Sequence, residues 1–198
     1  MLEIHKEYVK AGADVITANT FQANELKLSD CGYSVEEIIT AGVQLAKKSG
    51  AKFSALDIGP LGQLMEPMGT LSFDDAYKMF KRQIVAGEKA GADIILFETM
   101  SDLLEVKAGI LAARENTNLP VFVTITFQED GRTFVGCDPK SVAVTLSGLG
   151  VDALGVNCSL GPEELMPTID ELIKYSRVPV MIQPNAGLPK IENEKTVY

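Results

Sequence analysis

The sequence has 198 residues, of which 46% are hydrophobic and 23% charged, and its 27 acidic and 18 basic side chains give a formal net charge of −9. This composition is typical of a globular protein and excludes a disordered or fibrous chain. The acidic excess supplies no broad positive field, which argues against a nucleic-acid-binding protein. No apolar run approaches the roughly 20 residues that span a bilayer, so we expect no membrane segment.

The cysteines and the N-terminal segment indicate the compartment. Cys31, Cys137 and Cys158 are widely spaced and odd in number, which does not suit a disulfide framework. The opening MLEIHKEYVKAGAD contains acids and no long apolar region, so it does not resemble a secretory signal. We expect a cytoplasmic protein that forms one domain over residues 1–198.

One phrase recurs along the chain and indicates how the fold is built. AGADVITANT at 11–20 returns as AGADIILFET at 90–99 and, more loosely, as LGVDALGVNCS at 149–159. Each copy places a glycine where a helix can end in the left-handed conformation, followed by the apolar run of a buried parallel strand. The recurrence predicts alternating helices and strands.

The predicted elements follow from this pattern in chain order. Six strands are expected, at Val15–Asn19, Phe53–Asp57, Ile94–Glu98, Val121–Thr126, Ala153–Asn157 and Val180–Gln183. Amphipathic helices are expected between them, at Val35–Lys48, Phe73–Ala90, Asp102–Arg114 and Glu163–Tyr175. Asp130-Gly131 predicts a hairpin turn in the loop after the fourth strand.

This alternation implies a parallel sheet, for which an open doubly wound sheet and a closed (β/α)8 barrel are the two candidates. Neither a glycine-rich dinucleotide motif nor a GK[ST] loop is present. A barrel would gather the polar strand-end residues around one mouth. These residues are Asn19, Asp57, Glu98, Thr126, Asn157 and Asn185. However, a barrel usually needs ~250 residues and eight strands.

Cys158 and Glu98 are the strongest candidates for chemistry. A cysteine at a strand end can be a nucleophile, a metal ligand or a small buried side chain, and burial is the commonest case. His5, the single histidine, lies on the first helix and does not indicate a Cys-His pair, and no Cys-x-x-Cys motif completes a zinc site. Glu98 ends an apolar strand, where it can be satisfied by backbone amides or bind a substrate ammonium group, and we favour the second. The strand-end Asn residues suit turns, and Asp57 suits a cap.

Five phrases at strand ends resemble a known family. They are NTF at 19–21, DIGP at 57–60, FET at 97–99, GVNCSLGP at 155–162 and PNAG at 184–187. In this order they resemble the homocysteine S-methyltransferase family over essentially the whole chain. SLGPEE and PNAGLP are most similar to the homocysteine-binding module of cobalamin-dependent methionine synthase. The resemblance implies a truncated (β/α)8 TIM barrel that covers strands two to seven of eight.

The resemblance also implies a chemistry, the transfer of a methyl group to the homocysteine thiol to give methionine. The family binds a catalytic zinc through three cysteines, of which the first corresponds to Cys158. The other two lie in a Gly-Gly-Cys-Cys-Gly phrase that this sequence does not contain, and the glycine loop of the family's first strand is also missing. Zinc would keep a bound homocysteine sulfur deprotonated. The methyl donors, cobalamin and methyltetrahydrofolate, would act through other modules.

On this resemblance we assign roles to six residues. Glu98, Asn19, Asn157 and Asp57 are expected to bind substrate, and Cys158 and Asn185 to face the metal. A barrel without its first and last strands has open edges, so we also expect self-association. The alternative is a non-catalytic truncated barrel used for binding or assembly. An aldolase-like barrel would need a lysine on a strand, and no predicted strand core contains one.

Overall fold

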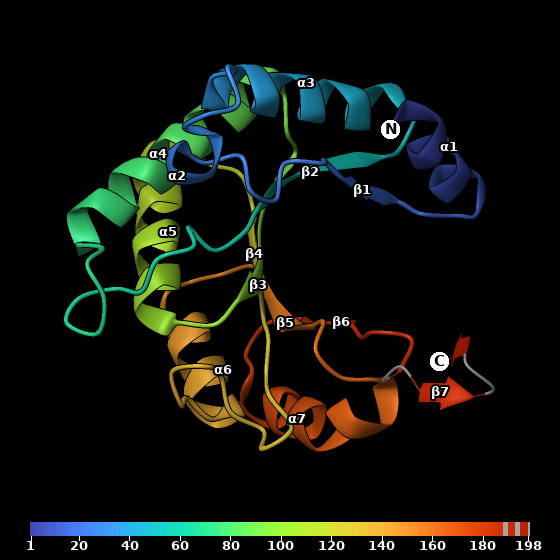
Figure 1. The fold of residues 1–198 in the computed structure, drawn as a ribbon, viewed down its shortest axis with the longest axis vertical. Helices are drawn as coiled ribbons and strands as arrows, with labels where there is room; N and C mark the ends of the chain where they lie inside the picture. The colour runs from blue at the N-terminus through green and yellow to red at the C-terminus, as the bar shows by residue number, and fades with distance from the viewer. Residues whose placement is uncertain (188–189, 193–194, 198) are drawn as a thin grey trace. The chain divides into compact units, whose positions relative to one another are not determined.

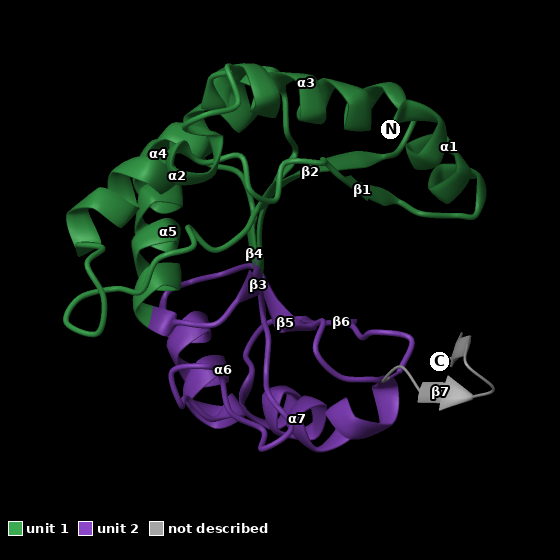
Figure 2. Ribbon diagram, viewed as in Figure 1, with its two compact units in different colours: residues 1–98, 104–122 green, residues 99–103, 123–198 purple. Residues whose placement is uncertain are grey.

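The computed structural model describes residues 1–187, 190–192 and 195–197, and the chain divides into two compact units (Figures 1 and 2). Unit 1 comprises residues 1–98 and 104–122, and unit 2 comprises residues 99–103 and 123–198. The helices are α1 (Leu2–Lys10), α2 (Glu25–Leu28), α3 (Val35–Lys48), α4 (Phe73–Ala90), α5 (Leu103–Asn116), α6 (Pro139–Gly148) and α7 (Pro162–Tyr175). The strands are β1 (Val15–Thr17), β2 (Phe53–Ile58), β3 (Ile94–Met100), β4 (Val121–Ile125), β5 (Ala153–Asn157), β6 (Val180–Gln183), β7 (Lys190–Glu192) and β8 (Lys195–Val197).

Strands β1 to β6 are hydrogen-bonded in chain order in one sheet. The β1–β2, β2–β3 and β5–β6 pairs are parallel, and Asp57 of β2 is in register with Leu96 of β3. A doubly wound sheet reverses its strand order at a switch point, whereas a barrel adds each strand beside the last. The observed order therefore favours the barrel over the open sheet.

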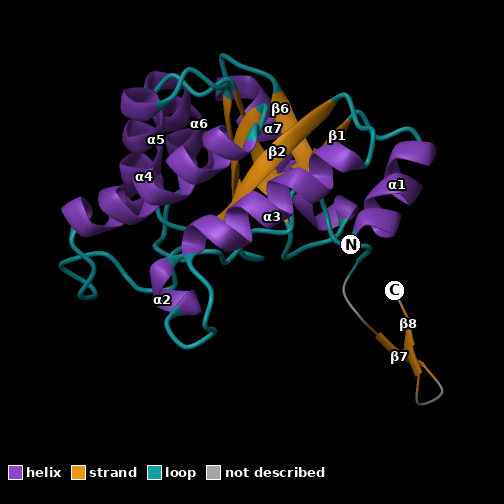
Figure 3. Cartoon of the chain, turned by 90° about the horizontal axis from the view of Figure 1, so that it is seen from above, coloured by secondary structure: helices purple, strands orange, loops and turns teal. Residues whose placement is uncertain are grey.

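In unit 1, helices α3 and α4 each begin at a side-chain cap and bury an apolar face against the strands. Ser34 and Glu37 form a capping box at the start of α3, and Ser72 caps α4. Helix α3 packs on β1 and β2 (Figures 1 and 3). Phe80 of α4 meets Phe97 of β3 edge to face, with 5.5 Å between ring centroids. This packing fixes the ends of β2 and β3, where two of the predicted site residues lie.

In unit 2, helices α6 and α7 pack on each other and on β5, and α7 also packs on β6. Strands β7 and β8 form an antiparallel pair that the sequence pattern did not indicate. Among the helices that the structure describes, none combines the length and apolar character needed to cross a bilayer.

The predicted strands and helices are confirmed, with boundaries that shift by no more than two residues. The three glycines of the recurring phrase, Gly12, Gly91 and Gly150, all have positive φ, as expected. Two predictions were incomplete or wrong. Helix α6 was missed because its Ser, Thr and Val residues are weak helix formers. Residues 129–131 do form a turn, but no strands flank it, so the predicted hairpin is wrong.

Candidate functional site

In unit 1, two carboxyl groups lie at the ends of neighbouring strands, and we call Asp57 and Glu98 the carboxyl pair. Ile58 of β2 is in register with Phe97 of β3, so the two carboxyl-bearing residues flank this register position on adjacent strands. Asp57 is 6% exposed and Glu98 is partly buried. The Thr20 hydroxyl donates to the Asp57 carbonyl at 2.8 Å and accepts from the Asp57 amide at 3.2 Å, which ties the β1 loop to the end of β2.

Both carboxyl groups hold their protons more tightly than usual. Burial, and secondly the negative charge of Glu98, raises the pKa of Asp57 to about 8. Burial also raises the pKa of Glu98. At the pH at which Glu98 ionises, Asp57 still holds its proton. Asp57 therefore adds no negative charge that would raise the pKa of Glu98 further. Because the charge of Glu98 is one of the causes that raise the pKa of Asp57, Glu98 ionises first, and the pair then carries a protonated Asp57 beside an ionised Glu98.

The Asp57 side chain has an unmet hydrogen-bonding need. Its Oδ1 is buried and has no partner among the residues that the structure describes. A buried polar atom without a partner costs on the order of 1–3 kcal/mol and is rare in native structures. The predicted cap of the following turn is therefore not seen at this atom.

The predicted substrate residue Asn19 is exposed at the end of the β1 segment. It lines a cavity of about 340 Å³ with loop residues and with residues of α2 and α3. The other lining residues are Thr20, Phe21, Gln22, Ala23, Leu28 and Ile38. Thr20, which borders this cavity, also bonds to the backbone of Asp57.

In unit 2, the side chains of Thr99, Asn157 and Cys158 form a hydrogen-bonded group that we call the thiol cluster. The Thr99 amide donates to Asn157 Oδ1 at 3.1 Å, and Asn157 Nδ2 donates to Thr99 Oγ1 at 2.6 Å and to Cys158 Sγ at 3.3 Å. Because Thr99 Oγ1 accepts from the amide, its own proton can point to Cys158 Sγ, 3.8 Å away. The sulfur of this half-buried cysteine therefore accepts from Asn157 and lies beside the Thr99 hydroxyl, a contact in which either atom can be the donor.

The backbone of this region is strained. Thr99, Cys158 and Ser159 have φ of 58°, 59° and 59°, and they are the non-glycine residues with positive φ among the described residues. A left-handed conformation costs ~1–2 kcal/mol at a residue with a Cβ, and such residues cluster at functional sites. The Ser159 hydroxyl pairs with that of Thr126, which continues the polar network to the end of β4.

Asn185, the second predicted metal-facing residue, lies in the loop after β6. Its amide donates to the Leu160 carbonyl at 3.0 Å, while the Cys158 amide donates to the Gln183 carbonyl at 3.1 Å. These bonds join the loop that carries Asn185 to the loop that carries Cys158. The Asn185 side chain is exposed.

The donor set does not fit a complete zinc site. Within residues 1–187 and the other described segments, no three His, Cys, Asp or Glu side chains are arranged to hold a metal ion. Cys31 is exposed and its thiol donates to the Tyr33 carbonyl, and Cys137 is half-buried. Among the described residues, Cys158 therefore lies without the two further thiols that a three-cysteine site would need.

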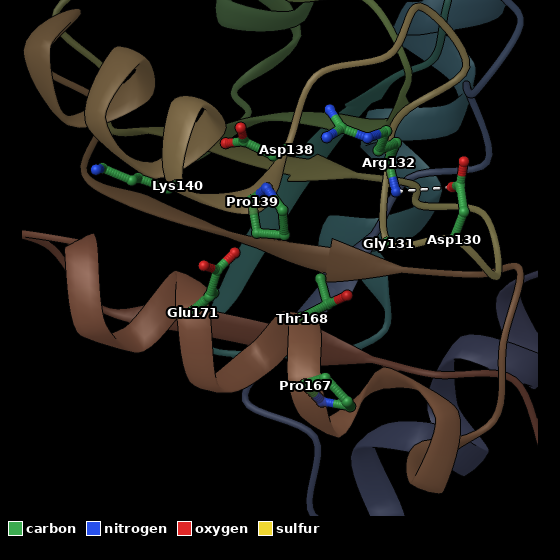
Figure 4. A pocket seen from close by; sticks show the side chains of 9 residues that line it. All are labelled: Asp130, Gly131, Arg132, Asp138, Pro139, Lys140, Pro167, Thr168 and Glu171. Carbon is green, nitrogen blue, oxygen red and sulfur yellow. Dashed lines mark hydrogen bonds between the residues drawn. The ribbon is translucent and has the colours of Figure 1, made fainter.

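Unit 2 also has an open cavity of about 520 Å³ on its surface (Figure 4). Its lining carries charges of both signs, and several groups are already engaged. Asp138 caps α6 by accepting from the Ser141 amide, and the Arg132 guanidinium donates to the Gly136 carbonyl. The lining residues are Asp130, Gly131, Arg132, Asp138, Pro139, Lys140, Pro167, Thr168 and Glu171. No residue of the predicted site lines this cavity.

The sequence analysis missed Thr99 as a member of the site. Its phrase, FET, was singled out for the glutamate, and nothing in the letters shows that the next residue turns left-handed toward a cysteine 59 positions later. A β-branched residue at the end of a strand carries no such signal, because the conformation depends on its partners in the fold.

Comparisons with known proteins place these features in a family. The model of the family described as homocysteine S-methyltransferase matches residues 1–198. Methionine synthases of Mycobacterium leprae and Mycobacterium tuberculosis are each 30% identical over 210 residues, which cover 98% of this chain. The chain spans only 17% and 18% of the length of those two proteins.

Solved structures show the fold. The metallated form of the homocysteine methyltransferase MmuM from Escherichia coli matches with a TM-score of 0.84 at 22% identity, over 94% of this chain and 72% of that one. The apo form of MmuM matches with a TM-score of 0.77 at 23% identity, over 94% of this chain and 71% of that one. The predicted fold class, a partial (β/α)8 barrel, is confirmed. With the family model matched from the first residue to the last, this chain belongs to the homocysteine S-methyltransferase family.

Proposed function

We propose that this chain binds homocysteine and contributes to the transfer of a methyl group to its thiol, as part of a barrel of this family. The observation that carries the proposal is the family match over residues 1–198. The 30% identity to methionine synthases supports methionine as the product. In this proposal residues 1–198 form the part of the barrel that corresponds to strands two to seven.

The carboxyl pair suits the ammonium end of the substrate. Glu98 is half-buried, and burial strengthens its attraction for a cation because water screens the charge less. Asp57 Oδ1 lacks a donor that an ammonium group would supply. Asn19 lines the cavity beside Thr20 and offers an amide for the polar end of the substrate.

The thiol cluster suits the sulfur end of the chemistry. We assign Cys158 as one thiolate ligand of a zinc ion that would keep the homocysteine sulfur reactive, with Asn157 as its orienting residue and Asn185 as a polar neighbour. Further thiolates would have to come from outside the described donor set. Cobalamin-binding and folate-binding modules would supply the methyl group, consistent with the small share of the methionine synthases that this chain spans.

Homocysteine titrated into the chain and into Glu98→Gln, followed by NMR, tests the proposal. We expect the variant to bind at least tenfold more weakly, because a hydrogen bond to a charged group contributes ~1.5–3 kcal/mol. Glu7→Gln, on an exposed position of α1, serves as the matched control. Equal binding by the parent chain and Glu98→Gln would refute the role of Glu98.

The incomplete donor set supports a second candidate, a non-catalytic module for binding or assembly. The edge strands β1 and β6 expose Val15 at 40% and Ile182 at 44%, which suits pairing with a second copy of the chain. Light scattering that shows association reversed by Val15→Lys or Ile182→Lys supports this candidate. Methyl transfer to homocysteine upon addition of the missing modules supports the enzyme instead.

Zinc binding separates the two candidates further. We expect the chain alone to hold zinc weakly, because one thiolate gives only a fraction of the affinity of a full tetrahedral site. Stoichiometric zinc that survives dialysis and is lost in Cys158→Ser would show that other residues or a second copy complete the site.

A further inference from the structure

One oxygen of the buried Asp57 carboxyl group lacks a hydrogen-bond partner in the described part of the chain. The side chain is 6% exposed, and its Oδ1 accepts no hydrogen bond from any residue in the described part of the chain. The hydroxyl of Thr20, in the loop after β1, bonds to the carbonyl and the amide of the Asp57 backbone. The fold therefore maintains a buried acid whose acceptor atom is free.

Burial is the larger reason why Asp57 stays protonated, and the charge of a neighbouring residue is the second. Glu98 on β3 is the charged group that acts on it, and its sign is the same. The helices that pack on β2, α3 and α4, present buried side chains without titratable groups. These are Val35, Ile39, Gly42, Val43, Ala46, Ala76, Phe80, Gln83, Ile84, Ala86 and Gly87. Two ionised carboxylates without a cation would repel each other in a poorly hydrated place.

A ligand ammonium group supplies what is missing. It carries the positive charge that the carboxyl pair lacks and three N–H donors, enough for Glu98 and for the free oxygen of Asp57. An adjacent cation lowers the pKa of a carboxyl group by roughly 1–3 units. Starting from about 8, this brings Asp57 to or below neutral pH.

Resting on the proposed function, we propose that binding of the substrate ammonium group by Asp57 and Glu98 expels the Asp57 proton to solvent. The neutral acid becomes a carboxylate, its proton leaves to the buffer, and the amine remains a cation throughout. The site thus exchanges one proton for one ammonium group. It selects a free amino group over an acylated one, because an amide nitrogen brings no charge to compensate the second carboxylate.

The exchange predicts a pH dependence for substrate affinity. Protons compete with the ammonium group below the pKa of the free acid, so affinity rises with pH through this range. For a ligand without a thiol we expect a rise of roughly threefold to eightfold between pH 6.5 and 7.5. Asp57→Asn removes the exchanged proton and with it this rise.

Carbon-13 NMR of the aspartate carboxyl carbons tests the exchange directly. L-homoserine is the probe, because it keeps the amino acid group of homocysteine and has no thiol that titrates. N-acetyl-L-homoserine is the matched ligand without the ammonium charge, and Asp57→Asn assigns the resonance. We expect L-homoserine to lower the Asp57 titration midpoint by 1–3 pH units and the acetylated ligand to leave it unchanged.

The outcomes separate this inference from the proposed function. If L-homoserine shifts the backbone amide signals of unit 1 and its affinity is reduced in Glu98→Gln, but the Asp57 midpoint stays unchanged, the proton exchange is refuted and the ammonium site stands. If neither L-homoserine nor homocysteine shifts any amide signal at saturating concentration, the proposed function fails and the exchange fails with it.

Discussion

The two groups of polar residues at strand ends differ in how completely their hydrogen bonds are satisfied. In unit 1, the carboxyl pair is short of partners, since Asp57 Oδ1 is buried without a donor and the charged neighbour has the same sign. In unit 2, the thiol cluster is saturated, since Asn157 makes three hydrogen bonds to Thr99 and Cys158. The first group is arranged to gain stability from a ligand, whereas the second is already fixed before any ligand arrives.

This difference follows from where each group stores its unfavourable free energy. The carboxyl pair stores it in desolvation, which a cation can relieve. The thiol cluster stores it in the backbone, in the left-handed conformation of Thr99 and Cys158. The comparison leads to three tests, and the largest effect is expected where the hydrogen bonds are most complete.

Asn157→Ala should be the most destabilising change. Asn157 is 2% exposed, and its removal leaves the Thr99 amide without its 3.1 Å partner. Losing this network and the packed side chain should lower the free energy of unfolding by ~3 kcal/mol. Urea denaturation monitored by circular dichroism measures this, and Asn185→Ala, at an exposed position, should change stability by less than ~0.5 kcal/mol. Equal effects of the two substitutions would contradict a structural role for the cluster.

Asp57→Asn should change the pH dependence of stability. The unfolded carboxyl group ionises near pH ~3.9, and the folded one holds its proton until about pH 8. The folded state therefore binds one more proton between these values, so this group makes stability fall as pH rises from 4 to 8 and contributes no slope above 8. Relative to Asp57→Asn, the parent chain should lose up to ~1.4 kcal/mol per pH unit within this window. Parallel stability curves from pH 5 to 8 would contradict the raised pKa.

Glu98→Gln refines this second test. Removing the negative charge should lower the pKa of Asp57, and the group should stay above its usual range because burial is the larger cause. The falling part of the stability curve should then end at a lower pH than in the parent chain. A curve that ends at the usual range of an aspartate would show that charge, not burial, dominates.

The strands were predictable because each is a buried apolar run bounded by polar residues, and IILFE needs no tertiary information to be recognised as one. Helix α6 was not predicted, although Asp138 as its N-cap and Pro139 at its first position form a recognisable start signal for a helix. The hairpin failed for a different reason. The turn is closed locally, because the Gly131 amide donates to the Gln128 carbonyl and Asp130 Oδ1 accepts from the Arg132 amide, so it needs no paired strands.

The positions of the candidate residues at strand ends were predictable from the sequence, whereas their burial and backbone conformation were not. Glu98, Asp57 and Cys158 stand at strand ends in the letters, which is where a barrel concentrates polar groups. That Asp57 is buried without a partner for Oδ1 depends on how α3 and α4 pack on β2, which the sequence pattern does not show. The left-handed backbone at Cys158 is invisible as well, because sequence analysis assigns positive φ to glycine and asparagine first.

Substitutions at Thr99 separate backbone strain from the hydroxyl and give the smallest expected effect. Thr99→Gly relieves the φ of 58° and removes the hydroxyl that contacts Cys158 Sγ, so its two effects oppose each other and the net change should stay within ~1 kcal/mol. Thr99→Val keeps the strain and loses the hydroxyl, and it should be less stable than Thr99→Gly by ~1–2 kcal/mol. Thr99→Ser keeps the hydroxyl and should lie close to the parent chain. Urea denaturation ranks the three variants, and a Thr99→Val as stable as Thr99→Gly would show that the left-handed backbone at this position costs nothing.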